Sequence, residues 1–177
     1  SFHQSKNIEK ALLDCDLLKQ GRDFCYDGEV MEFTRSSQDS FYSKDKPFYP
    51  CDALEETSDD LYSLSCGRNQ PVVFVSRLGM TFEDAIKLCG ENNLSSKFKG
   101  SCFDALGFML ASTQDVNKII NGCKNMNSAE YSSLCFKSAA GELNFQNVPN
   151  WQEKSKVVCD ASPTAKMCHD NLERLIK

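Results

Sequence analysis

The sequence is poor in the residues from which catalytic and metal sites are built. It has two histidines, no Cys-x-x-Cys pair and no glycine-rich phosphate-binding loop. Zinc sites draw on closely spaced cysteines and histidines, and a nucleophile needs an adjacent base. His169, which lies between Cys168 and Asp170, is interpreted as a surface residue of a helix. We therefore expect no enzymatic activity, no metal site and no cofactor.

Two further absences exclude other classes of partner. The net charge is -5, and no basic cluster stands out along the chain. Nucleic acid is not an expected partner, because binding to its backbone requires lysine and arginine side chains that neutralise phosphates. No apolar run approaches the roughly 20 residues that cross a bilayer, so we expect no membrane span in this sequence.

What the sequence does contain is ten dispersed cysteines, an even number. A cytosolic enzyme rarely carries so many, whereas disulfides persist in oxidising compartments. We therefore expect a secreted protein, or the extracellular face of a cell-surface protein, with up to five disulfide bonds. The sequon Asn93-Leu94-Ser95 makes Asn93 a candidate glycosylation site. The cysteines are Cys15, Cys25, Cys51, Cys66, Cys89, Cys102, Cys123, Cys135, Cys159 and Cys168.

Four segments have apolar residues at helical spacing, and each includes a cysteine on its apolar face. Thr81 stands where a residue that caps a helix N-terminus is expected, and Gly90 stands where a helix stops. Proline after Ser162 is typical of a helix start, so the chain is expected to end in a helix. The four segments are Ile8–Cys15, Phe82–Cys89, Val116–Cys123 and Cys168–Ile176.

Other apolar runs are short and predict β-strands. Val72–Val75 is β-branched and apolar and follows Pro71, which is typical of a buried strand. Residues 27–46 are polar with scattered aromatic side chains and are expected to be irregular or short-stranded. The remaining expected strands are Leu134–Phe136, Leu143–Phe145 and Lys156–Cys159.

This order of elements resembles the C-type lectin-like fold over roughly residues 71–161. The string Met80–Cys89 is similar to that family's first helix, and Gly107–Ser112 is similar to the entry into its second helix. Asn147–Pro149, followed by Val157–Asp160, is similar to its closing segment. The resemblance implies a disulfide-rich α+β fold.

The resemblance also implies a division of the chain and one disulfide bond. Residues 1–70 would be a disulfide-tethered N-terminal extension, 71–161 the lectin-like core, and 162–177 a C-terminal helix packed on that core, all in one compact unit. Cys89 and Cys159 would form the family's long-range bridge. The family's usual partner for Cys135 is missing, which leaves Cys123 or Cys168 as alternatives.

The sequence departs from the family where calcium-dependent sugar binding needs its ligands. It has neither a Glu-Pro-Asn nor a Gln-Pro-Asp motif. Phe145-Gln146-Asn147 stands where the family has Trp-Asn-Asp, and it lacks the carboxylate that binds calcium. We therefore expect no calcium-dependent sugar binding.

The first functional hypothesis is a secreted or cell-surface module that recognises an extracellular or cell-surface protein. Trp151 is a candidate binding residue, although it also suits a position covering the core. A second set of candidate binding residues, the four aromatic residues given at the end of this paragraph, suits either a recognition loop or a small core under Cys51. The alternative hypothesis is a mostly helical disulfide-stapled domain that serves as a secreted ligand or carries a small apolar molecule. The second set is Phe41, Tyr42, Phe48 and Tyr49.

Overall fold

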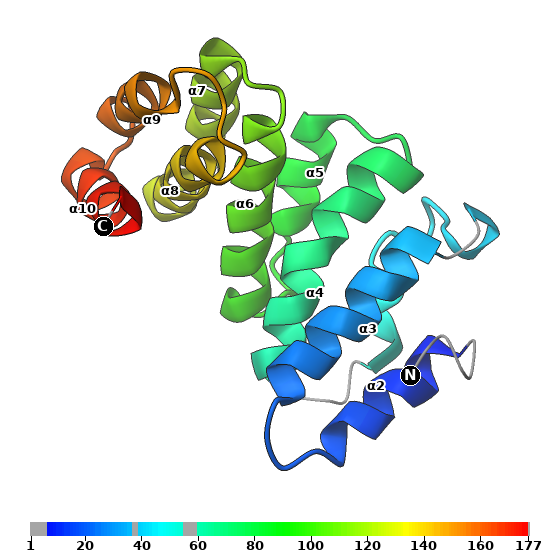
Figure 1. Cartoon of the computed structure of the whole chain (residues 1–177). Helices are drawn as coiled ribbons and strands as arrows, with labels where there is room; N and C mark the ends of the chain where they lie inside the picture. The colour runs from blue at the N-terminus through cyan, green and yellow to red at the C-terminus, as the bar shows by residue number, and fades with distance from the viewer. Residues whose placement is uncertain (1–6, 37–38, 55–59, 177) are drawn as a thin grey trace. The chain divides into compact units, whose positions relative to one another are not determined.

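The structure is a computed structural model that describes residues 7–36, 39–54 and 60–176. Every regular element among these residues is helical, and one isolated bridge pairs Ser43 with Lys46 (Figure 1). The expected α+β C-type lectin-like fold is therefore wrong, and the mostly helical, disulfide-stapled alternative is confirmed. The elements are α2 (Ile8–Asp16), α3 (Arg22–Ser36), η1 (Asp39–Phe41), η2 (Cys51–Leu54), α4 (Asp60–Val72), η3 (Val73–Arg77), α5 (Phe82–Cys89), α6 (Ser96–Ala111), α7 (Val116–Lys124), α8 (Ala129–Phe145), α9 (Trp151–Asp160) and α10 (Ala165–Ile176).

All four expected helices are present, as α2, α5, α7 and α10, whereas every expected strand lies in a helix. Val72–Val75 spans the end of α4 and the π-helix η3, with Pro71 inside α4. Leu134–Phe136 and Leu143–Phe145 belong to α8, and Lys156–Cys159 belongs to α9. The reason is burial: a short apolar run fits a buried helix as well as a strand, and periodicity does not separate the two.

Each disulfide bond joins two cysteines that follow one another among the ten. The predicted bond between Cys89 and Cys159 is wrong, because Cys89 is bonded to Cys102 and Cys159 to Cys168. Cys135 pairs with Cys123, one of the two alternatives that the sequence left open. The five bonds are Cys15–Cys25, Cys51–Cys66, Cys89–Cys102, Cys123–Cys135 and Cys159–Cys168.

The five bonds define a repeated element, which we call a disulfide hairpin: two consecutive helical segments joined by one bond. The five hairpins are α2–α3, η2–α4, α5–α6, α7–α8 and α9–α10. The second cysteines recur at intervals that shorten along the chain: 41 residues from Cys25 to Cys66, 36 from Cys66 to Cys102, and 33 for each of the last two intervals. Recurrence at a period of 20–50 residues is the signature of repeat architectures.

The chain forms two compact units divided at Cys102, within α6. In the N-terminal unit (residues 1–102), α3 packs against both α2 and α4. In the C-terminal unit (residues 103–177), α8 packs against α7, α9 and α10. Each unit therefore has at its centre the second helix of a disulfide hairpin.

One contact recurs between successive hairpins. The residue directly after the second cysteine of a hairpin meets the residue four positions before the second cysteine of the next. Two of these contacts are aromatic pairs, and the third is a close approach in which a Cβ on Gly67 would lie 2.4 Å from the Phe98 carbonyl oxygen. The three contacts are Tyr26 with Tyr62 (ring centroids 5.6 Å apart), Gly67 with Phe98, and Phe103 with Tyr131 (stacked, 4.3 Å).

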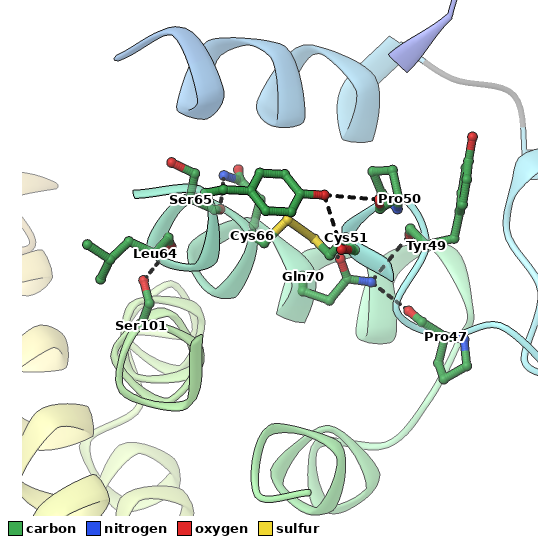
Figure 2. Close-up of a disulfide and its surroundings, with 11 residues drawn as sticks. Pro47, Tyr49, Pro50, Cys51, Leu64, Ser65, Cys66, Gln70 and Ser101 are labelled. Atoms are coloured by element: carbon green, nitrogen blue, oxygen red, sulfur yellow. Dashed lines mark hydrogen bonds between the residues drawn. A yellow bond between two sulfur atoms is a disulfide. The ribbon is translucent and has the colours of Figure 1, made fainter. Parts of the chain in front are cut away.

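Buried polar side chains fix the loop that precedes η2 (Figure 2). The fully buried Gln70 lies on α4 beside the Cys51–Cys66 bond. Tyr62 lies on the same helix and is also buried. Buried backbone carbonyls need hydrogen-bond donors, so these side chains hold the loop against α4. The Tyr62 hydroxyl donates to the carbonyls of Pro50 (3.2 Å) and Cys51 (3.1 Å), and Gln70 Nε2 donates to those of Pro47 (2.5 Å) and Tyr49 (3.4 Å).

The two paired tyrosines predict that the fold loses stability in alkali. Burial, with the hydrogen bond to Asp16, raises the pKa of Tyr26 to about 12, and burial raises the pKa of Tyr62 well above the ordinary tyrosine value of 10.0. Their contribution to stability is complete below pH 10, where tyrosine is neutral in both states. It falls as the pH rises above 10, because the unfolded state then releases protons that the folded state retains.

We therefore expect the urea concentration at the unfolding midpoint to fall steeply between pH 10 and pH 12. Unfolding is measured by the loss of the helical circular dichroism signal. Tyr62→Phe is the matched variant: its midpoint is lower at neutral pH, since two carbonyls lose a donor, but it declines less in alkali. A wild-type midpoint that stays constant from pH 8 to pH 12 contradicts this prediction.

Candidate ligand-binding cleft

A cleft of about 670 Å³ lies between α8 and α10 in the C-terminal unit. This volume is within the range of roughly 300–1,000 Å³ that is typical of small-molecule sites. Its apolar lining includes Leu134 of α8, together with Pro163 and Met167 at the start of α10. Met167 is 61% exposed, although it is a large apolar side chain. The cleft therefore presents an apolar surface to solvent.

Local sequence explains how the two walls form. Ser128 caps α8 by accepting a hydrogen bond from the Tyr131 backbone N–H at 3.2 Å. Ser162 Oγ accepts one from the Thr164 N–H at 3.2 Å, just before α10 begins. The Cys159–Cys168 bond then ties the first turn of α10 to the end of α9. The lining residues of α10 are thus held by a cap and a covalent bond.

The cleft is lined by charges of both signs. Lys137 and Glu130 of α8, and Arg174 and Asp170 of α10, are among its lining residues. Helix α9 follows α8, precedes α10 and packs against both.

The two cations differ in their partners. Lys137 Nζ lies 3.9 Å from Asp104 Oδ1, so its charge is partly offset. Arg174 has no ion pair with any other residue that the structure describes. Its planar guanidinium suits two parallel hydrogen bonds to a carboxylate. Arg174 is therefore the better candidate for an anionic ligand group.

The four aromatic candidates of the N-terminal unit each contact another aromatic ring of the same unit. Phe33 lies in edge-to-face contact with Phe41, Tyr42 and Tyr49, with ring centroids 5.6 to 5.8 Å apart. The fourth, Phe48, contacts Phe74 and Phe98 in the same way. This arrangement fits the small core that the sequence left as an alternative to a recognition loop. A role in partner binding stays a prediction for these four residues.

The other candidates lie apart from the cleft lining. Trp151 is half-buried at the start of α9, where its backbone N–H donates to the Val148 carbonyl at 2.9 Å. Asn93 is exposed in the turn between α5 and α6, and its glycosylation stays a prediction. His169 Nε2 lies 2.8 Å from Asp160 Oδ1. Lys156 and then His169 hold the pKa of that carboxyl below its usual range.

The sequence interpretation missed the cleft because it assigned Leu134 to a strand. On a helix, Glu130, Leu134 and Lys137 share one face at spacings of four and three residues. Met167, Asp170 and Arg174 do the same on α10. The helical pattern was therefore present in the sequence, but its significance depends on knowing that α8 and α10 are neighbours.

Comparison of the chain with protein-family models, with curated proteins and with solved structures found no significant match. Within residues 7–36, 39–54 and 60–176, no helix is long and apolar enough to cross a membrane. The same residues contain no cluster of three or more His, Cys, Asp or Glu side chains suited to holding a metal. The five disulfide bonds are typical of an extracellular or secreted protein.

Proposed function

We propose that this chain is an extracellular, non-catalytic carrier of a small amphipathic molecule, which binds in the α8–α10 cleft. The observation that carries the proposal is the cleft itself: Met167 and Leu134 form an apolar lining in a space large enough for a ligand. An exposed large apolar side chain beside a concave surface is typical of a binding site. Methionine suits such a surface because its flexible side chain adapts to different ligand shapes.

The charges of the cleft favour a ligand with one acidic group. A carboxylate placed beside Arg174 would be stabilised by charge-assisted hydrogen bonds. The alkyl part would then extend along the apolar lining toward Pro163. Lining residues of α8 run from Ala129 to Lys137, about 12 Å along the helix axis at 1.5 Å per residue. The proposed ligand class is therefore a medium-chain fatty acid.

Calorimetric titration with decanoate, below its micelle concentration, tests the proposal. We expect saturable binding with one site per chain. Met167→Asp and Leu134→Asp should each weaken it by roughly 10- to 100-fold, since each removes an apolar contact worth about 1.5–3 kcal/mol. Val157→Asp is the matched control, because Val157 is 43% exposed on α9 and does not line the cleft.

A second comparison tests the head group. Arg174→Gln should weaken decanoate by about 10-fold or more, in line with a hydrogen bond to a charged group. It should leave binding of decanol, which has no carboxylate, unchanged. No saturable binding by the wild type, or equal affinities for wild type and Met167→Asp, would show that the cleft is not a carrier site.

A further inference from the structure

The exposed side of α3, in the N-terminal unit, carries a second apolar surface. Phe24, Gly28, Met31 and Arg35 recur at spacings of four, three and four residues, so they share one helix face. We call these four residues the α3 face. Phe24 is 79% exposed and Met31 is 40% exposed. An open groove of about 530 Å³ runs along them, and Glu29 and Glu32 also line it.

The α3 face lies opposite the side of α3 that packs into the protein. Tyr26, Val30 and Phe33 are almost completely buried. They recur at spacings of four and three residues, so they form a second stripe along α3. Each is offset by two residues from a member of the α3 face, which is about half a turn of an α-helix. Phe24 and Met31 therefore place apolar side chains on a side of α3 that the residues described by the structure leave exposed.

The repeat shows that the same position is covered in another hairpin. Phe24 directly precedes the second cysteine of its hairpin, as Ser101 does in the α5–α6 hairpin. Ser101 is buried, and its Oγ donates to the Leu64 carbonyl of α4 at 2.7 Å. In α3 the corresponding residue is a large aromatic side chain exposed to solvent. A surface of this kind is typical of a protein contact.

We propose that the α3 face is the contact through which two copies of this chain associate. The face is self-complementary about a two-fold axis that passes between Gly28 and Met31. With the two α3 helices antiparallel, Met31 of each copy lies opposite Gly28 of the other. A Cβ at Gly28 would meet no atom within 4 Å, so that position leaves room for an incoming side chain.

The same symmetry places the ends of the face together. Arg35 of each copy lies opposite Phe24 of the other, an arrangement that allows a cation–π contact. A parallel pair would instead leave Gly28 opposite Gly28, with a hollow unfilled. An antiparallel pair also opposes the two helix dipoles favourably. The geometry therefore favours a closed dimer with the same face on both copies.

Sedimentation equilibrium over protein concentrations from the micromolar to the submillimolar range tests the dimer. We expect a reversible monomer–dimer equilibrium for the wild type. Phe24→Glu and Gly28→Lys should each weaken association by at least 10-fold. Lysine is a better helix former than glycine. Gly28→Lys therefore separates a lost contact from a lost fold, because its thermal stability should not decrease.

The matched control is Phe145→Glu, since Phe145 is 84% exposed at the end of α8 in the C-terminal unit. This variant should dimerise as the wild type does. A wild type that stays monomeric at all concentrations overturns the proposal. So does a dimer that persists undiminished in both Phe24→Glu and Gly28→Lys, because the contact then lies elsewhere.

Discussion

Reduction of the disulfide bonds is expected to unfold this chain at 25 °C and neutral pH. Each bond closes a loop of 9 to 15 residues. In the chain-entropy model a 15-residue loop contributes about 3 kcal/mol, so five such loops contribute on the order of 10 kcal/mol or more. The total stability of a domain is about 5–15 kcal/mol. The bonds therefore account for most of the margin that keeps the chain folded.

The effect has a second source in packing. Cys15, Cys89, Cys102, Cys123, Cys135 and Cys159 are completely buried. The four bonds that these cysteines form thus belong to the contact between two helices as well as linking them. Free thiols at these positions would no longer hold the helix pairs at a fixed separation. The hairpins, which are short, have little stability in isolation because helices under about 12–15 residues are marginal in water.

Far-UV circular dichroism and urea titration, before and after reduction and alkylation, measure this effect. The reduced chain should lose most of its helical signal and its cooperative transition. The oxidised chain, treated with the alkylating reagent alone, is the control, since the cysteines of the structure are all bonded. A reduced chain that retains a cooperative transition at the same urea midpoint contradicts the prediction.

The helices that the sequence predicts correctly have one apolar face and a recognisable start. In α5, Thr81 Oγ1 accepts a hydrogen bond from the Asp84 N–H at 3.1 Å, as the capping pattern predicts. In α7 the cap is Asp115, which accepts from Asn117 and Lys118. Both helices are short and bury one side only, so their apolar residues keep the helical period.

Helix α8 was mistaken for strands because it is buried on several sides. Neighbouring helices α7, α9 and α10 all pack against it. Buried residues therefore occur on adjacent positions, such as Cys135 with Phe136 and Ala139 with Ala140, and only a narrow half-buried stripe remains to mark the helical period. The lectin-like resemblance rested on short strings that a capped helix with a cysteine also matches. The 33-residue interval between second cysteines was the better signal, because it belongs to the hairpin itself.

The cleft and the α3 face differ in what the sequence reveals of them. The α3 face depends on one helix, so its spacing is visible once Arg22–Ser36 is taken as helical. The cleft depends on the packing of two helices against each other, which is known only from the tertiary structure. No local rule places Leu134 beside Met167, although both directly precede the second cysteine of a hairpin. The repeat therefore supplies information about the cleft that individual segments do not.

Replacing Gly107 with alanine is expected to destabilise the C-terminal unit by about 1–3 kcal/mol or more, the usual cost of overpacking. An alanine Cβ at this position of α6 would lie 2.2 Å from the carbonyl oxygen of Cys135 on α8. It would also lie 2.9 Å from the Cα of the same residue. The obstacle is backbone in the middle of a buried helix, so it cannot be relieved by a change of rotamer. Helices α6 and α8 would have to move apart.

Such a movement would weaken other contacts between the same two helices. The stacked rings of Phe103 and Tyr131 are 4.3 Å apart, and Lys137 lies 3.9 Å from Asp104. Alanine favours a helix over glycine by about 0.8–1.0 kcal/mol, so the intrinsic propensity opposes the clash. The sign of the change in unfolding free energy therefore tells which of the two effects is larger. We expect the clash to be larger, because the added Cβ meets backbone atoms that cannot move aside.

Gly28→Ala is the matched control, because the same substitution on α3 meets no atom within 4 Å. We expect it to raise stability by up to about 1 kcal/mol, since only the helix propensity changes. Urea titrations of the two variants at low protein concentration should shift the midpoint in opposite directions. Gly122 lies between these cases, because its added Cβ would meet the Leu110 side chain at 2.6 Å, and a side chain can move. Equal stability of Gly107→Ala and the wild type would mean that α6 and α8 do not approach this closely.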